Sequence, residues 1–588
     1  MPVLVTGMLL TACGGGGSDA PAPAPAPSPA PAPSMVNVAG VVSFEFPLPR
    51  SNCRGLNLDN PEVRPIRAVT VQLFDSSDAL LESTVSGTDG SYSFGNIDAS
   101  TDVYVRVRAE LKSSGPAVWD VEVRDNVDES IEPPPLSSRP IYVVDFPPFN
   151  TGTANISDAD FTATTGWGGN SYTEPRLAAP FAILDAILDG MEMITDVDPT
   201  ATFPPLDAFW SVNNTLTSPE NIDLGELPSS FYNPRIDSLF LLGDANLDTE
   251  EFDDHVTIHE WGHYFEDNFS RSDSTGGAHS IGQRLDPRLA FSEGFATALA
   301  AIALENPQYC DTSAPLESSG FGLDTEDADR GDQGYYNEMS VATLLYDFFD
   351  TDIDGSDNDS IGFGPIYSVM TGPQAMTEAF TTLFSFATEL RNIVQPEDLA
   401  FVDSQLTREN VDLTGLNVYG DNQTIVPAGS RDVLPLYTDL PTDGTVVNIC
   451  TNSDSDSERD GNKLSEHRFL RMEVLANRTH TIRVTTESFE TGNPPTQPGG
   501  GFDCEAAGLA DLDDPQVHTY SDPDLVIWRG GSFVGQSLSC TPNSEVITTQ
   551  TLTVGTHLID LNEFRFADED TIDGYPERVC FDVTAMQN

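Results

Sequence analysis

Two histidines and a glutamate stand at a spacing that suits a metal site. The segment HVTIHEWGHYFED contains His259, Glu260 and His263. Helical side chains four residues apart lie on one face, so both imidazoles can reach the same metal ion. Glu260 lies beside that face, where its carboxylate can hold a water molecule and accept its proton. The alternative is a surface helix that carries two histidines by chance.

A third ligand is expected from a second helix, because a catalytic zinc ion takes three protein ligands and keeps one open position. The pattern LAFSEGFATALAAIAL over residues 289–304 predicts an apolar helix, and Glu293 is an acid within it. A charge there is costly unless it is paired or bound to metal. The segment Ser-Glu-Gly-Phe-Ala also resembles the ligand helix of gluzincin aminopeptidases and their relatives. The resemblance implies a zinc peptidase with Glu293 as ligand; a surface salt bridge is the alternative.

The residues after His263 distinguish this chain from two other groups of zinc peptidases. A metzincin would have Gly at 266 and His at 269, and this chain has Glu266 and Phe269. Glu293 follows His263 by 30 positions, a longer spacing than in thermolysin-like enzymes, and the intervening RSDSTGGAHSIGQRLDP predicts a flexible loop. Thr297 stands where those enzymes carry an Asp that orients a ligating histidine. Another acceptor is therefore expected, from Asp254, Asp267 or a backbone carbonyl.

Hydrolysis of a peptide also needs a donor for the oxyanion of the tetrahedral intermediate. The candidates are Tyr335, Tyr336 and His279. Tyr336 is favoured because YYNEMSVATLLYDFFD resembles the helix that follows the ligand helix in several gluzincin families. The alternative is that both tyrosines pack in the core. His255, one turn before His259, is interpreted as a solvated or capping residue.

A second metal pattern follows at residues 350–359. Asp350, Asp352 and Asp354 alternate with other residues before Gly355, as in a calcium loop, although Ile361 takes the place of the final Glu. The pattern predicts a Ca²⁺ site, with an acidic loop in an acidic protein as the alternative.

The N-terminus indicates export. Residues 1–12 form a short apolar signal, and Leu-Thr-Ala-Cys ending at Cys13 looks like a bacterial lipobox, which implies lipidation of Cys13. Residues 13–35 are Gly-rich and then Ala-Pro-rich, which predicts an extended tether. We therefore expect a protein lipid-anchored to the bacterial outer membrane or cell surface. No apolar run is long enough for a transmembrane helix.

The remaining cysteines favour disulfides, because six is an even number in an exported chain. Four of them fall in the last third of the chain, where we expect two bridges with the pairing left open. Those four are Cys450, Cys504, Cys540 and Cys580.

The body of the chain divides into three modules. Residues 36–147 alternate apolar and polar residues, and Asp-Gly-x-Tyr-x-Phe at 89–94 resembles a carboxypeptidase regulatory-like (prealbumin-like) β-sandwich. Residues 148–430 predict an α+β, helix-rich, gluzincin-like catalytic domain with helices at 177–195, 253–268, 288–306 and 337–350. Residues 431–588 resemble a pre-peptidase C-terminal β-sandwich, through DPDLVIWRGG at 522–531.

The net charge of the chain restricts the classes of molecule that it can bind. The 588 residues carry a formal charge of −66, which repels phosphate backbones and excludes nucleic acid as a partner.

We expect a zinc peptidase that acts on peptides or proteins and contacts a membrane only through its lipid anchor. Gly190-Met191-Glu192-Met193 faintly resembles the Gly-x-Met-Glu-Asn strand by which gluzincin aminopeptidases hold a substrate amine. Here the segment lies in a helical pattern and lacks the Asn, so amine recognition is unsupported and endopeptidase activity is favoured. One alternative is an aminopeptidase. The other is a non-catalytic surface lipoprotein that binds glycan or protein and whose zinc site is structural or vestigial. The sequence leaves the oligomeric state open.

Overall fold

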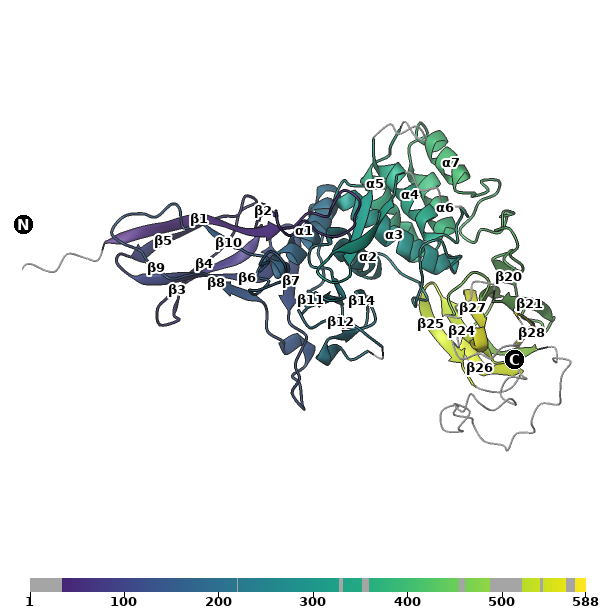
Figure 1. Ribbon diagram of the computed structural model, residues 1–588. Coiled ribbons are helices and arrows are strands. Elements are labelled where there is room, and N and C mark those ends of the chain that lie inside the picture. Colours follow the sequence, from purple (N-terminus) through teal and green to yellow (C-terminus); the bar gives the residue numbers. More distant parts are fainter. Residues whose placement is uncertain are drawn as a thin grey trace, which may run out of the picture.

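The molecule is a multidomain, β-rich chain with a helical region in its middle (Figure 1). The computed structural model describes residues 34–218, 220–326, 332–351, 359–453, 461–486, 521–539, 543–566 and 577–588. Strands form one end of the elongated shape, the helices follow, and a second group of strands forms the other end. Cys13 and most of the expected tether lie outside the described residues.

The N-terminal strands alternate buried and solvent-facing residues, as the sequence predicts. On the third strand Val69, Val71 and Leu73 are buried, and on the sixth Val103, Val105 and Val107 are buried. These strands are β1 (Met35–Phe46), β2 (Glu62–Pro65), β3 (Val69–Asp75), β4 (Leu80–Val85), β5 (Ser91–Asp98), β6 (Asp102–Ser114), β7 (Val118–Arg124), β8 (Val143–Asp145), β9 (Phe149–Asn150) and β10 (Phe161–Ala163).

One sheet continues from these strands into the helical region. Its order is β14-β15-β11-β7-β6-β3-β4, with β8 and β9 paired to β6, while β10-β1-β2 and β5 form a second sheet. The sheet therefore crosses the boundary near residue 147, and the domain limits stay a prediction. The later strands are β11 (Leu206–Trp210), β12 (Thr215–Leu216), β13 (Glu226–Leu227), β14 (Phe231–Asn233), β15 (Ser238–Leu241), β16 (Gly243–Asp244), β17 (Asp248–Thr249), β18 (Gln308–Ser313) and β19 (Ser319–Asp324).

The helices occupy the expected segments. Helix α1 runs through the Gly190–Met193 segment, which confirms that this segment is helical rather than a strand. The described part of the chain contains α1 (Ala179–Val197), α2 (Asp254–Phe269), α3 (Pro287–Ala303), α4 (Glu338–Phe349), α5 (Phe363–Val369), α6 (Leu383–Ile393) and α7 (Leu399–Arg408). Helix α3 begins at Pro287 because the Asp286 side chain accepts the Arg288 N–H at 2.9 Å, and proline suits the first turn.

Two glycines allow the helices of the site to approach closely. A Cβ on Gly262 of α2 would lie 3.0 Å from Ala296 Cα of α3. A Cβ on Gly294 of α3 would lie 2.4 Å from the Glu338 carbonyl oxygen and 2.5 Å from Val341 Cβ of α4. Real Cβ atoms do not come as close as 2.4–2.5 Å, so α3 and α4 pack at this distance only with glycine at 294, and a side chain at 262 would require α2 and α3 to separate slightly.

The C-terminal strands form two sheets over a core of their own. Their orders are β20-β22-β27-β24-β25 and β21-β28-β23-β26. Leu470, Ile482, Ile527 and Phe581 from both sheets lie in one apolar cluster. These strands are β20 (Tyr437–Asp439), β21 (Val447–Asn452), β22 (His467–Val474), β23 (Arg478–Thr486), β24 (Pro523–Arg529), β25 (Ser532–Ser537), β26 (Ser544–Leu552), β27 (Gly555–Glu563) and β28 (Arg578–Gln587).

Two disulfides join distant parts of the chain, in agreement with export. Cys53 pairs with Cys310, which joins the N-terminal region to β18, and Cys450 pairs with Cys580 between β21 and β28. The second is one of the two bridges expected in the last third. Cys504 and Cys540 lie outside the described residues, so the other stays a prediction.

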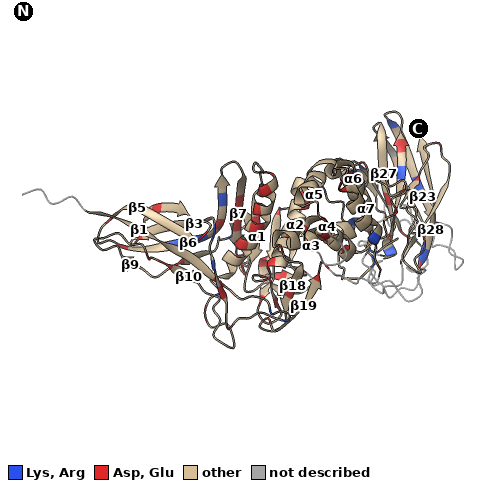
Figure 2. Ribbon diagram, turned by 90° about the horizontal axis from the view of Figure 1, so that it is seen from above, with Lys and Arg blue, Asp and Glu red and all other residues tan. Residues whose placement is uncertain are grey.

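Acidic residues are spread along the molecule, and Lys and Arg are few (Figure 2). Within the described residues, no helix combines the length and the apolar character needed to cross a membrane.

Candidate metal centre

Helices α2 and α3 bring the three expected ligands together. His259 Nε2 lies 3.2 Å from His263 Nε2 and 3.2 Å from Glu293 Oε2, and His263 Nε2 lies 3.4 Å from the same oxygen. Zinc bonds of about 2.0–2.2 Å in tetrahedral geometry separate neighbouring ligand atoms by about 3.3–3.6 Å. The donor set of two imidazoles and one carboxylate, at this spacing, fits zinc.

The neighbouring histidines keep the buried Glu293 carboxylate ionised. Glu293 is only 8% exposed. Its burial alone would raise its pKa, but His263, His259 and His279 hold the pKa well below its ordinary value. The carboxylate is therefore ionised and able to bind a metal at neutral pH.

Hydroxyl groups orient the two imidazoles. His259 Nδ1 lies 3.1 Å from Thr297 Oγ1, and His263 Nδ1 lies 3.4 Å from Ser292 Oγ, which donates to Glu266 Oε2 at 2.5 Å. These contacts leave each Nε2 directed at the metal position. Thr297 lies four residues after Glu293, so helical spacing alone could have identified it.

The acceptors expected from the sequence were wrong, because both acids are engaged elsewhere. Asp254 accepts from Arg64 Nη1 at 2.9 Å, and Asp267 accepts from the Tyr232 hydroxyl at 3.0 Å.

Glu260 sits between the metal position and an edge strand. It is 9% exposed, and its Oε2 accepts the Tyr232 N–H of β14 at 2.9 Å. Burial raises the pKa of Glu260, and His259 and His263 oppose that shift. A carboxyl group with a raised pKa is suited to take up a proton and release it again near neutral pH.

His279 is the oxyanion-donor candidate that reaches the metal set. Its Nε2 lies 3.4 Å from Glu293 Oε2 and 3.5 Å from Glu338 Oε2, and its Nδ1 lies 3.1 Å from the Gly277 carbonyl oxygen. Burial alone would lower the pKa of His279, but Glu293 and Glu338 raise it to about 9. The sequence analysis did not single out Glu338, the first residue of α4.

The two tyrosines point elsewhere. The Tyr336 hydroxyl donates to the Gln333 carbonyl at 3.0 Å, and Tyr335 is buried with its ring 4.6 Å from that of Phe384. A role for Tyr336 stays a prediction. His255 is buried rather than solvated, with Nε2 3.1 Å from the Asn306 carbonyl oxygen, and burial lowers its pKa to about 4.

The expected calcium loop is only partly within the described residues. Asp350 follows the last residue of α4, whereas Asp352 and Asp354 lie outside the described residues. Calcium binding there stays a prediction.

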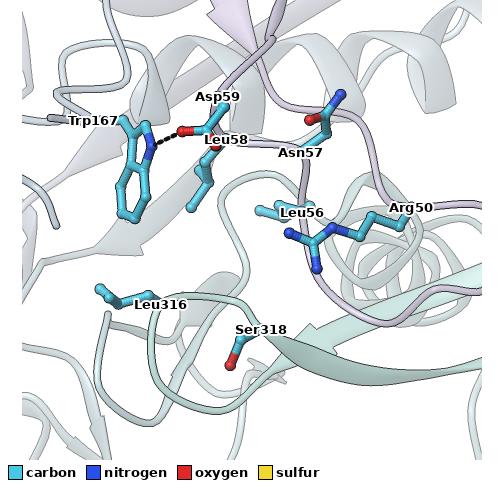
Figure 3. A pocket seen from close by; sticks show the side chains of 8 residues that line it. All are labelled: Arg50, Leu56, Asn57, Leu58, Asp59, Trp167, Leu316 and Ser318. Carbon is cyan, nitrogen blue, oxygen red and sulfur yellow. Dashed lines mark hydrogen bonds between the residues drawn. The ribbon is translucent and has the colours of Figure 1, made fainter. Parts of the chain in front are cut away.

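Figure 3 shows a small hollow that shares no residue with the metal set. Trp167 Nε1 donates to Asp59 Oδ1 across its rim at 2.7 Å. The lining residues are Arg50, Leu56, Asn57, Leu58, Asp59, Trp167, Leu316 and Ser318.

Residues 226–395 match the family model of the mycolysin C-terminal domain. That range includes β14, α2, α3 and α4, and with them the whole metal set. The chain therefore contains a peptidase-associated region. No curated protein matches the chain.

Among solved structures, the protealysin precursor, a metalloproteinase from Serratia proteamaculans, is 9% identical and has a TM-score of 0.29. The match covers 51% of this chain and 89% of that one. The pre-peptidase C-terminal domain of a Bacillus anthracis collagenase is 6% identical with a TM-score of 0.15, over 25% of this chain and 93% of that one. Scores this low carry no argument about function.

Proposed function

We propose that the chain is an exported zinc metallopeptidase that hydrolyses peptide bonds. The observation that carries the proposal is the mutual approach of His259, His263 and Glu293 to 3.2–3.4 Å, with Glu260 beside them. The match of residues 226–395 to a peptidase-associated domain supports it.

Each side chain around the metal position has a role. Bound there, zinc would supply a Lewis acid with one open position, which acidifies water and polarises a carbonyl. Glu260 would accept the proton of the attacking water and pass it to the leaving amine. His279 Nε2 would donate to the carbonyl oxygen as it gains charge; we favour it over Tyr336 because of its position next to Glu293.

The substrate would bind along β14. Within the described residues this strand ends its sheet and pairs with β15 alone, so its outer edge can accept an extended peptide. The Tyr232 N–H that binds Glu260 belongs to the same strand, which would bring a bound peptide next to the base.

The decisive variant is Glu260→Gln. It should retain zinc, because Glu260 is not a ligand, and should lose cleavage of casein, because an amide cannot accept the proton. Glu397→Gln, at an exposed position before α7, is the matched control and should cleave as wild type does. Equal casein cleavage by the two variants would contradict the proposal.

Assays with different peptide substrates distinguish this proposal from two rival functions. Cleavage of free but not N-acetylated peptides would indicate an aminopeptidase. Stoichiometric zinc with no cleavage across a broad peptide library would indicate a non-catalytic lipoprotein.

We also propose that Cys13 is lipidated and anchors the chain to the membrane, on the basis of the Leu-Thr-Ala-Cys pattern. Labelled palmitate should be incorporated into the wild-type chain in a bacterial host and not into the Cys13→Ser variant. Equal labelling of both would contradict the anchor.

A further inference from the structure

The C-terminal domain contacts the loop that carries His279. Residues 271–280 connect α2 towards α3 and form no helix or strand. Asn462 Nδ2 donates to the carbonyl oxygens of Gly276 at 2.9 Å and of Ala278 at 3.0 Å. Lys463 Nζ donates to the same Ala278 oxygen at 2.9 Å. Two side chains of the C-terminal domain thus bind the carbonyl oxygen directly before His279.

Backbone hydrogen bonds extend this contact. The Asp286 N–H donates to the Asn462 carbonyl at 2.8 Å, and the Leu464 N–H donates to the Arg284 carbonyl at 2.9 Å. Leu285 and Lys463 form an antiparallel bridge between the two segments. Residues 284–286, between this loop and α3, therefore obtain backbone partners from residues 462–464.

The position of Lys463 is unusual for this chain. Lys112 and Lys463 are the two lysines of the sequence, and Lys463 is only 3% exposed. A buried ammonium group is costly unless its donors are bound, and Lys463 binds Ala278 and the Asn462 side-chain oxygen. Arg288 at the start of α3 is also bound to this domain, through Asp560 Oδ2 at 2.7 Å.

We infer that the C-terminal domain completes the catalytic site, with Asn462 and Lys463 as positioning residues that hold His279 beside Glu293. The inference rests on the proposed peptidase function. A loop released from these contacts would leave His279 without a fixed place, while the three metal ligands on α2 and α3 would stay where they are.

The test is a double-mutant cycle on the zinc-loaded full chain. Lys463→Met should lower kcat for a peptide substrate on the order of 10- to 100-fold, with zinc content and KM little changed. Lys112→Met, on β6, should behave as wild type. In a His279→Ala background, Lys463→Met should cause no further loss, because its effect passes through His279.

Several results would overturn the inference. One is that Lys463→Met lowers kcat by the same factor with and without His279. Another is that Lys463→Met has no effect on kcat. A third is that His279→Ala raises kcat by freeing the open metal position. Hydrogen exchange of residues 274–281 provides a readout without activity: exchange should be faster in Lys463→Met than in Lys112→Met. Faster exchange in a chain with no peptidase activity would refute the proposed function alone, whereas unchanged exchange would refute the positioning role.

A second, independent observation is a group of buried and half-buried acids from two segments, residues 248–253 before α2 and residues 311–317 after α3. Oxygen atoms of Asp248, Glu250 and Asp311 lie within 4.8 Å of one another. Asp253 and Glu317 flank them, and Thr312 Oγ1 lies between the two, 2.8 Å from Asp253 Oδ2 and 3.0 Å from Glu317 Oε2. We call these five residues the acidic cluster.

Three acids of the acidic cluster are buried, Asp248 and Asp311 are half-buried, and four of the five have an oxygen without a hydrogen-bond partner. Glu250 is 4% exposed, and Asp253 and Glu317 are each 1% exposed. Buried oxygens without a hydrogen-bond partner are Asp248 Oδ1, Glu250 Oε2, Asp253 Oδ1 and Glu317 Oε1. Within the described ranges no Lys or Arg forms an ion pair with any of the five.

Burial of this many carboxyl groups requires a compensating charge or protons. Burial and neighbouring acids raise the pKa of Asp248 to about 7, and burial raises that of Asp311 to about 6. A hard divalent cation with carboxylate ligands would satisfy the free oxygens directly.

We propose that the acidic cluster binds a Ca²⁺-type cation. Glu250 lies four residues before α2, and Asp311 follows the disulfide-bonded Cys310. The cation would join β17 to β18 and fix the start of the helix that carries His259 and His263.

Calcium titration of the full chain in a Glu260→Gln background, which prevents self-digestion, tests this site. Added Ca²⁺ should raise the thermal unfolding midpoint by several degrees. Glu250→Gln and Asp311→Asn should lose that rise, whereas Asp98→Asn, at an exposed position, should keep it. In calcium-free buffer both cluster variants should unfold at a higher temperature than their parent, because repulsion is removed.

A full calcium response in both cluster variants would place the ion elsewhere, for example at 350–359. No response of the parent to Ca²⁺ or Mg²⁺ would mean that protons neutralise the acids. Either result would overturn the proposed site.

Discussion

At the scale of residues, the candidate metal centre depends on the side chains that orient the proposed ligands as much as on the proposed ligands themselves. His259 of α2 contacts the Thr297 hydroxyl of α3, and the Ser292 hydroxyl connects His263 to Glu266. A hydroxyl group can accept from Nδ1 and thereby fix which imidazole nitrogen faces the metal. Ser292 and Thr297 do so here with hydroxyl groups in place of a carboxylate.

Removal of one such hydroxyl should weaken zinc binding while leaving the ligands in place. Thr297→Val keeps the shape of the side chain and removes the Nδ1 partner of His259. Zinc affinity should fall about 10- to 100-fold, measured by competition with a chelating dye.

The control is Thr388→Val in α6, where the hydroxyl donates to the Phe384 carbonyl of its own helix. It should leave zinc affinity unchanged. Equal affinities for the two variants would show that Thr297 does not orient His259.

At the scale of elements, the close packing of α2, α3 and α4 sets the distances within the site. Helix α3 carries Glu293 and is in contact with both neighbours through Gly262 of α2 and through its own Gly294. A shift of α3 would move Glu293 relative to both histidines.

Gly294→Ala should therefore destabilise the helical region. Its Cβ would overlap the Glu338 carbonyl oxygen and Val341, and such overpacking costs about 1–3 kcal/mol. Urea unfolding followed by circular dichroism measures the change. Gly364→Ala in α5 meets no atom within 4 Å and should be neutral or slightly stabilising. A Gly294→Ala chain as stable as Gly364→Ala would contradict the packing account.

Sequence reasoning predicted the elements well where the hydrophobic period was strong. Helices α1 to α4 lie where the apolar pattern places them, and the i, i+4 rule brings His259 and His263 together. Contacts between distant segments could not be predicted this way. The approach of Asn462 to the His279 loop and the Cys53–Cys310 bond depend on tertiary packing, which no local period encodes.

The same limit applies to the acceptors of the imidazoles. Asp254 and Asp267 are near in sequence, and both face away from the ligand side of α2, to Arg64 and Tyr232. The acceptors that are used, Ser292 and Thr297, come from α3. Helical spacing places Thr297 one turn after Glu293, whereas the contact of Ser292 with His263 depends on how the two helices pack.

At the scale of the whole molecule, a buried ionic network joins the C-terminal domain to the helical region. Asp560 of β27 binds Arg288 at 2.7 Å and His467 Nδ1 at 2.7 Å, and Arg288 is 3% exposed. Burial alone would lower the pKa of His467, but Asp560 raises it above its ordinary value. Burial would raise the pKa of Asp560, and Arg288 and His467 lower it instead.

This network predicts how stability depends on pH. A histidine whose pKa is raised by folding contributes its full stabilisation below its pKa in the unfolded state, about 6.5. This contribution is lost as the pH rises through its pKa in the folded state. A lowered aspartate pKa stabilises above about 3.9, and that contribution is lost on acidification. The network should therefore contribute most between about pH 4 and about pH 6.5.

Calorimetry of wild type and His467→Gln at about pH 5.5 and about pH 8.5 tests the sign. The variant should lower the unfolding midpoint more at the acidic pH, because the charged imidazole is absent there. An equal loss at both pH values would contradict a role for the imidazolium.

The central claim is that one zinc ion is held by His259, His263 and Glu293, and anomalous diffraction at the zinc absorption edge tests it most directly. Crystals of the zinc-loaded chain should show one strong anomalous peak about 2.0–2.2 Å from both Nε2 atoms and from a Glu293 carboxylate oxygen. A peak at another position, or a Glu293 carboxylate turned away from both imidazoles, would contradict the account.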